Sequence, residues 1–113
     1  MADLVINGQS IKLDEEGYLA SLEDWTELVG EAFANTLELD LTEAHWDVIH
    51  AMRSFYNTFQ LSPAMRPFIK YIRQQLGQEK STSLYLMTLF PGDGSPVKRI
   101  ALIAGLPKPD NCL

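Results

Sequence analysis

Residues 42–59, "TEAHWDVIHAMRSFYNTF", decide the fold that this chain is expected to adopt. Apolar side chains recur there at steps of three or four, which predicts one apolar stripe along a helix: Trp46, Ile49, Met52, Tyr56 and Phe59. Thr42 is a favourable N-cap, and Glu43 suits the first turn because a helix N-terminus attracts negative charge. We therefore expect a long amphipathic helix in the middle of the chain.

Three helices are expected beyond this stretch. Residues 62–77, "SPAMRPFIKYIRQQLG", combine a Ser-Pro start, with Ser62 as the cap, and a glycine stop. Pro67 disfavours a regular first turn, so either the helix begins near Met65 or that turn is distorted. Residues 81–91 and 95–105 predict a short apolar helix and a further helix with a glycine stop. The inner face of the 62–77 helix would carry Met65, Phe68, Ile69, Ile72 and Leu76.

A β-hairpin and one helix are expected before the central stretch. Residues 4–13, "LVINGQSIKL", alternate around Asn-Gly, which favours a type I′ turn because both central residues need positive φ. The predicted strands are Leu4–Ile6 and Ser10–Leu13. A helix should then run from residue 22 or 23 to residue 36. Its shared face would carry Leu28, Ala32 and Phe33.

The expected fold class is mainly α with a small N-terminal β-hairpin (α+β), arranged as a compact helical bundle. A chain of 113 residues that is 46% hydrophobic can bury one core. We expect a single domain over residues 1–105. Residues 106–113, "LPKPDNCL", contain two prolines and no periodicity, so we expect them to form a flexible C-terminal arm.

Composition also indicates a compartment. No apolar run approaches the roughly 20 residues of a membrane span. The first ten residues lack the basic and apolar regions of an export signal. Cys112 is the only cysteine, so no internal disulfide can form. Together these observations predict a cytoplasmic protein of a reducing compartment, without membrane contact.

Charge is distributed unevenly along the chain. Residues 1–50 hold twelve acidic residues and one basic residue, whereas residues 51–113 hold three acidic and eight basic ones. The acidic half disfavours nonspecific binding of nucleic acid. The basic half could present a patch to an acidic partner, a persulfide anion or a phosphate backbone, or it could simply be solvated. The candidate partner-binding residues are Arg66, Lys70 and Arg73, spaced to share the outer face of one helix, and Lys80, Lys98 and Arg99 after them.

Motifs for metal, cofactor or ordinary hydrolytic chemistry are missing. His45 and His50 are five residues apart, which does not place two imidazoles on one helical face, so we expect structural histidines. The sequence has no cysteine pair for zinc, no GxSxG and no glycine-rich phosphate loop. We therefore expect no metal and no cofactor, and we do not expect an ordinary hydrolase, kinase or oxidoreductase.

Cys112 is left as the candidate reactive residue. A thiol on an exposed arm suits a nucleophile or a carrier of a transferable group, because the arm can enter one partner's site and then another's. It lies seven positions after Gly105, so an extended arm would reach about 23 Å. The alternative is a free thiol in a frayed tail.

Five stretches resemble one known family. "GYL" (17–19), "HWDVI" (45–49), "SPAMR" (62–66), "YLMTLFP" (85–91) and above all "AGLPKPDNCL" (104–113) are similar to the TusE/DsrC family of sulfur-relay proteins. The resemblance implies a helical fold with an N-terminal hairpin, a helix-turn-helix-like element and a mobile arm. It also implies that Cys112 carries a persulfide, as in a sulfurtransferase-type carrier without a complete active site of its own.

The arm resembles the single-cysteine, TusE-like branch of that family. Proteins of the DsrC branch have a second cysteine eleven residues earlier, where this chain has Ala101. The resemblance implies a TusBCD-type complex as sulfur donor and a tRNA 2-thiouridylase as acceptor, with an indirect contact to the tRNA. One departure is the loop "PGDGSPVKR" (91–99), which is longer than the family pattern. The alternatives are another sulfur-trafficking route, or a helix-turn-helix regulator that binds nucleic acid through its basic helix.

Overall fold

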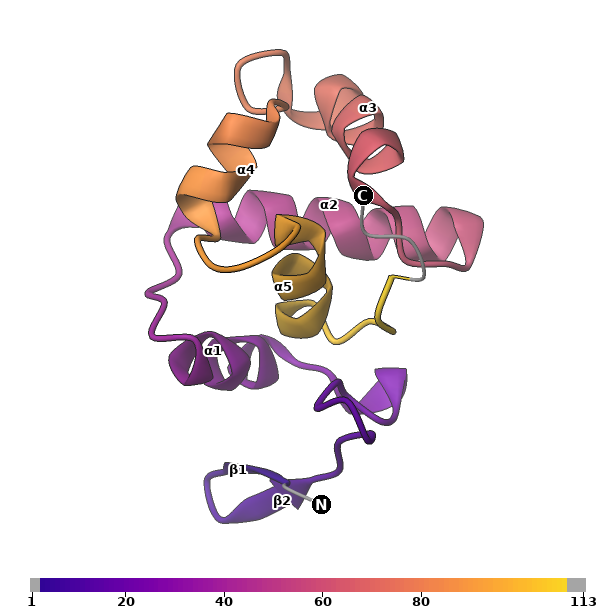
Figure 1. Cartoon of the computed structure of the whole chain (residues 1–113). Helices are drawn as coiled ribbons and strands as arrows, with labels where there is room; N and C mark the ends of the chain where they lie inside the picture. Colours follow the sequence, from indigo (N-terminus) through magenta and orange to yellow (C-terminus); the bar gives the residue numbers. More distant parts are fainter. Residues whose placement is uncertain (1–2, 110–113) are drawn as a thin grey trace.

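The helix expected in the middle of the sequence crosses the middle of the molecule (Figure 1). In the computed structural model, which describes residues 3–109, α2 (Glu43–Phe59) packs against α3 (Met65–Leu76) and α5 (Pro96–Ile103). α1 (Glu27–Thr36) packs on the other side of α5. α4 (Ser83–Leu89) closes the upper end in the view of Figure 1, between α3 and α5 along the chain.

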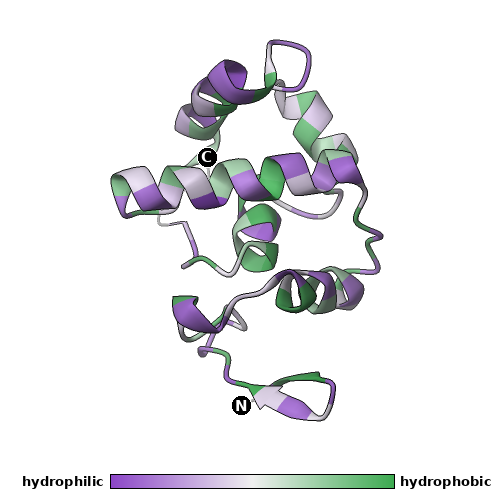
Figure 2. Cartoon of the chain, turned by 180° about the vertical axis from the view of Figure 1, so that it is seen from behind, coloured by the Kyte–Doolittle hydropathy of each residue, from purple (hydrophilic) through white to green (hydrophobic). Residues whose placement is uncertain are grey.

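The core is centred on α5. Hydrophobic residues concentrate on this helix, which is enclosed by α1, α2 and α3 (Figure 2). Burial at these positions removes apolar surface from water, which is the main favourable term in folding. The fully buried side chains of α5 are Val97, Ile100, Ala101 and Ile103, and those of its neighbours include Val48, Ile49, Met52, Phe68, Ile72, Leu86 and Phe90.

The N-terminal hairpin is confirmed. β1 (Leu4–Ile6) pairs antiparallel with β2 (Gln9–Ile11) around Asn7 and Gly8, whose φ values of 51° and 79° are those that a type I′ turn requires. The second strand ends at Ile11, earlier than the expected Leu13. Leu13 instead forms an isolated bridge with Leu19. The fold class, mainly α with a small hairpin, is thereby confirmed.

The helix expected from residue 22 or 23 is divided in two. A 3-10 helix, Leu22–Asp24, is followed by an extended Trp25, and α1 begins only at Glu27, with the Thr26 side chain accepting a hydrogen bond from the Val29 N–H. The expected inner residue Leu28 is 54% exposed. The face around Gly30 packs instead, because the missing side chain lets the helix approach: a Cβ there would lie 3.2 Å from the Ile103 carbonyl oxygen and from the Trp46 ring.

Two further details differ from the expectations. α3 begins at Met65, one of the two starts considered, and its N-cap is Ala64 rather than Ser62. The Ser62 hydroxyl donates to the Pro107 carbonyl instead. Phe59, the last member of the expected apolar stripe of α2, lies in the final turn and is 51% exposed, although its ring contacts that of Phe55.

His45 has a structural role, as expected. Its Nδ1 accepts a hydrogen bond from the Thr42 N–H at 3.0 Å, so Nε2 carries the proton and donates to the Leu89 carbonyl at 2.7 Å. The first contact completes a capping box at the start of α2, and the second ties α2 to the end of α4. His50 lies 3.3 Å from Glu27 and stacks on Trp46. None of the helices within residues 3–109 has the length and hydropathy of a membrane-spanning segment.

Candidate functional site

The candidate reactive residue, Cys112, lies outside the described residues, so its site is built from the root of the arm, residues 104–109. Cys112 lies only three positions after Pro109, the last described residue. The Cα of Cys112 therefore lies within about 11 Å of the Cα of Pro109. Whatever fixes the arm root thus fixes the region in which the thiol can react.

Two side chains hold the end of α5. The Trp25 Nε1–H donates to the Ile103 carbonyl at 2.8 Å, and Arg53 Nη1 donates to the Ala104 carbonyl at 2.6 Å. The Arg53 guanidinium also lies 4.0 Å from the centroid of the Trp25 ring, a cation–π contact. These bonds satisfy carbonyls that a helix C-terminus leaves without partners, and they place a cation where the helix dipole is negative. Burial lowers the pKa of Arg53 from its ordinary value.

The backbone turns sharply at Gly105. Its φ is +71°, and the turn is closed by bonds from the Gly105 N–H to the Leu102 carbonyl and from the Leu106 N–H to the Ala101 carbonyl. This is a Schellman motif, and the apolar residue after the glycine is buried, as is common for that motif. A Cβ on Gly105 would lie 2.2 Å from Trp25 Cδ1. The arm therefore leaves α5 in a direction that the surrounding side chains determine.

Contacts continue past the expected start of the arm. Leu106 and Pro109 both belong to the arm expected over residues 106–113, yet both are buried. The Pro107 carbonyl accepts from Ser62, and Lys108 Nζ lies 2.7 Å from a carboxylate oxygen of Glu16. This exposed ion pair contributes only about 0–1 kcal/mol to the stability of the fold. The flexibility of residues 106–113 stays a prediction, but their described part lies against the domain.

These positioning residues were missed in the sequence. Trp25 and Arg53 belong to no motif, and each reaches the arm root across a long sequence separation. Only one local signal was available, which is the glycine followed by leucine after the last helix, because that pair is typical of a Schellman motif.

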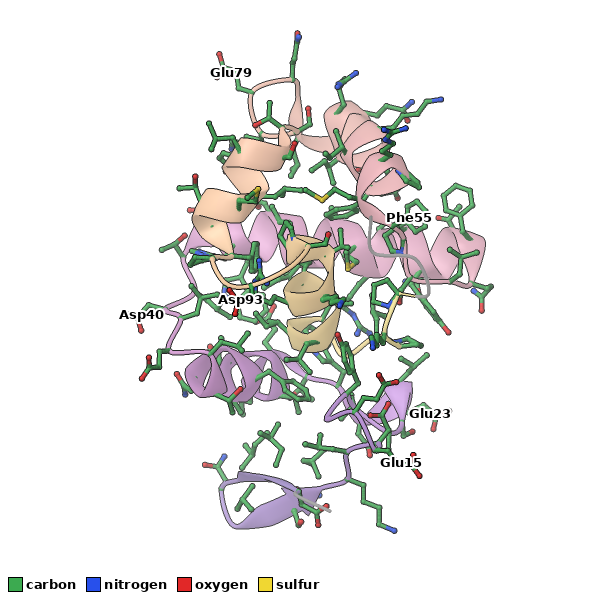
Figure 3. The ribbon with its side chains drawn as sticks, in the orientation of Figure 1. Glu15, Glu23, Asp40, Phe55, Glu79 and Asp93 are labelled. Atoms are coloured by element: carbon green, nitrogen blue, oxygen red, sulfur yellow. The ribbon has the colours of Figure 1, made fainter. Side chains whose placement is uncertain are left out.

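The six basic candidates do not form one cluster. Arg66, Lys70 and Arg73 are exposed on α3, and side chains ending in nitrogen project outward from that helix (Figure 3). Among residues 3–109, none of these three forms an ion pair. Lys80 is exposed in the turn after α3, and Lys98 is half-buried on α5.

Arg99 supports its own loop. Its guanidinium donates to the Phe90, Asp93 and Gly94 carbonyls at 2.8, 2.6 and 3.4 Å. Burial lowers its pKa, and the nearby Asp93 opposes that shift. The donors of Arg99 are thus used to hold the loop that looked long in the sequence. Its contact with a partner stays a prediction beside this structural role.

We expect Arg53→Met to destabilise the protein by about 2 kcal/mol, because the apolar stem remains while the bond to the Ala104 carbonyl and the cation–π contact are lost. Urea unfolding measures the change. The matched control is Arg73→Met on the exposed side of α3, which should change stability by less than about 0.5 kcal/mol. Equal effects of the two substitutions would show that Arg53 does not hold the arm root.

The chain matches one protein family and named relatives over nearly its full length. The family described as DsrC like protein matches residues 5–113. A protein of Photorhabdus laumondii called "Sulfurtransferase TusE" is 46% identical over 113 residues, covering 100% of both chains. A "Sulfurtransferase TusE homolog" of Haemophilus influenzae is 42% identical over 110 residues, covering 97% of this chain and 99% of that protein.

Solved structures show the same fold. The NMR structure of DsrC from Allochromatium vinosum is similar with a TM-score of 0.86 and 41% identity, covering 98% of this chain and 97% of that one. The crystal structure of DsrC from Archaeoglobus fulgidus, the oxidized gamma-subunit of the dissimilatory sulfite reductase, has a TM-score of 0.80 and 31% identity, with 99% and 100% covered.

Proposed function

This chain belongs to the DsrC-like protein family, and from that membership we propose that it is a sulfur-relay carrier that accepts a persulfide sulfur on Cys112 and passes it to a partner protein. The observation that carries the proposal is full-length similarity to relatives called sulfurtransferase TusE, in a chain with a single thiol at its penultimate position. The rigidly held arm root agrees with a thiol that partners must find repeatedly in the same place.

The chemistry is an exchange between sulfur atoms. The Cys112 thiolate attacks the terminal sulfur of a donor persulfide, forming a new S–S bond while the old S–S bond breaks. The donor leaves as a thiolate, so nothing is oxidised or reduced overall. Transfer to the acceptor repeats the step in the opposite sense. The chain needs no base of its own for this, because a partner can supply cations or amide donors that favour the thiolate.

We propose the tRNA wobble uridine as the final destination of the sulfur, with a TusBCD-type donor complex and a tRNA 2-thiouridylase as acceptor. Two features support this route. The relatives at 40–46% identity are called TusE, and the place of the second arm cysteine is taken by Ala101, which is fully buried in α5. A carrier with one thiol cannot close a disulfide within its arm, so it suits repeated transfer between proteins in a reducing cytoplasm.

Reconstitution tests this route. We expect formation of 2-thiouridine in a tRNA transcript to require the donor complex, the thiouridylase and this chain together, and to fall to background when the chain is omitted. Nucleoside mass spectrometry measures the product. Loading of Cys112 without any 2-thiouridine would assign the chain to another sulfur route, and tight binding to duplex DNA without loading would favour the regulator alternative.

A further inference from the structure

Two neighbouring cavities form one open groove beside the arm root. One of about 450 Å³ is lined by Pro107 and Lys108 at one end and by Phe55 and Pro67 at the other. The second, of about 340 Å³, shares Phe55 and Pro67 and continues to Lys70 on α3. We call the two together the aromatic groove. It runs from the segment that leads to Cys112 to the basic face of α3.

The groove has a rigid aromatic wall. Phe55 is buried, and its ring centroid lies 4.5 Å from that of Phe59 and 5.2 Å from that of Tyr71. Phe59 is nevertheless 51% exposed, and the neighbouring Leu61 is 54% exposed. Phe55, labelled in Figure 3, lies where α2 passes beneath α3. An exposed aromatic side chain that is held by packed rings is typical of an interface anchor, because little conformational entropy is lost on binding.

The rim of the groove is positive. Lys70 lines it, and Arg66 and Arg73 lie on the same side of α3, one turn away on either side. Neither cavity is lined by an aspartate or glutamate. At the arm end of the groove the charge of Lys108 is paired with Glu16, 2.7 Å away, so the positive charge of the rim comes from α3. The acids labelled Glu15 and Glu23 lie in the opposite half of the molecule, near the hairpin and the 3-10 helix (Figure 3). This groove therefore favours a ligand that combines an apolar side chain with negative charge.

We propose that the aromatic groove docks the proteins that exchange sulfur with Cys112, through an apolar segment flanked by carboxylates. This inference rests on the proposed function. A segment seated on Leu61 would share a cavity with Pro107 and Lys108, and it would meet Phe59 where it continues into the second cavity. The Cys112 Cα is within about 11 Å of Pro109. Docking in the groove would thus place a partner beside the arm root, within reach of the thiol.

Other occupants fit less well. In a symmetric pair of copies that share this face, Arg66, Lys70 and Arg73 would meet the same three cations, which is unfavourable. A nucleic acid would be attracted by these residues, but the chain carries a net charge of −6, and Phe55, Phe59 and Pro67 give the groove an apolar surface that phosphates do not match. A protein segment that has both apolar and acidic side chains can bind the aromatic wall and the positive rim of the groove together.

Two substitutions in the groove test the proposal, each with a matched control. We expect Phe59→Ser to slow sulfur transfer between this chain and a TusBCD-type donor complex at limiting concentration about thirtyfold, and Lys70→Glu about tenfold, with the second effect shrinking at high salt. The controls are Leu84→Ser, at a 75% exposed apolar residue of α4, and Lys12→Glu, at an exposed lysine after the hairpin. Both controls should transfer sulfur at the wild-type rate.

Each variant is also loaded with sulfur from glutathione persulfide, and the sulfur gained is measured by intact mass spectrometry. This measurement separates the groove proposal from the carrier function. Wild-type loading together with slow transfer from the protein donor supports docking in the groove. Wild-type loading with unchanged transfer in both groove variants overturns the groove proposal and leaves the carrier function intact. No loading of the unsubstituted protein overturns the carrier function itself. If the groove variants lose only affinity for a tRNA transcript, the groove binds RNA and the proposal is wrong.

Discussion

Replacement of Cys112 by serine is expected to abolish sulfur acceptance completely. The chain has no other thiol, and a serine hydroxyl is not ionised at neutral pH, so it cannot attack a persulfide sulfur. Intact mass spectrometry after incubation with a persulfide donor measures the effect. The wild-type protein should gain the mass of one sulfur atom or of a short sulfur chain, and Cys112→Ser should gain none.

The double variant Cys112→Ser, Ala101→Cys is the matched control, because it restores one thiol at a different place. Residue 101 is fully buried in α5, so its thiol should remain unloaded while the protein stays folded. Loading of this variant at the wild-type rate would show that any thiol suffices and that the arm has no special role. A sulfur adduct on the single Cys112→Ser variant would end the carrier hypothesis.

Features set by nearby residues could be predicted from the sequence. The turn at Asn7 and Gly8 needs only positive φ at two adjacent positions. The amphipathic pattern of α2 depends on its own periodicity, and the proline at position 67 left two possible starts for α3, of which the one at Met65 is found. In each case the residues that cause the feature lie within one or two turns of each other along the chain, so a pattern in the sequence reveals it.

Features set by distant residues could not be predicted. Trp25 reaches the Ile103 carbonyl across 78 residues, and Arg53 reaches the Ala104 carbonyl across 51. The exposure of Phe59 could not be predicted either, because it depends on how α3 packs on α2. Arg99 differs, because its partners are only five to nine residues away, but backbone carbonyls carry no mark in a sequence. The candidate site was therefore predicted at its reactive residue and missed at the residues that position it.

Gly105→Ala is expected to be among the most destabilising single substitutions in the chain. Its φ of +71° already disfavours a side chain by about 1–2 kcal/mol. In addition, the new Cβ would lie 2.2 Å from Trp25 Cδ1, so the indole must move and lose its bond to the Ile103 carbonyl and its contact with Arg53. The total loss should be about 4 kcal/mol, which lowers the unfolding midpoint by about 15 °C in a domain of this size.

Gly94→Ala separates the two causes, because this glycine has nearly the same backbone geometry and open surroundings. Its φ is +76°, and no atom lies within 4 Å of a Cβ placed there. It should lose only the backbone part, about 1–2 kcal/mol, measured by urea unfolding beside Gly105→Ala. Equal losses of stability in the two variants would show that the Trp25 indole can move aside without destabilising the protein. A much larger loss at Gly105 would instead show that the close approach of the indole to the backbone at the arm root contributes to the stability of the fold.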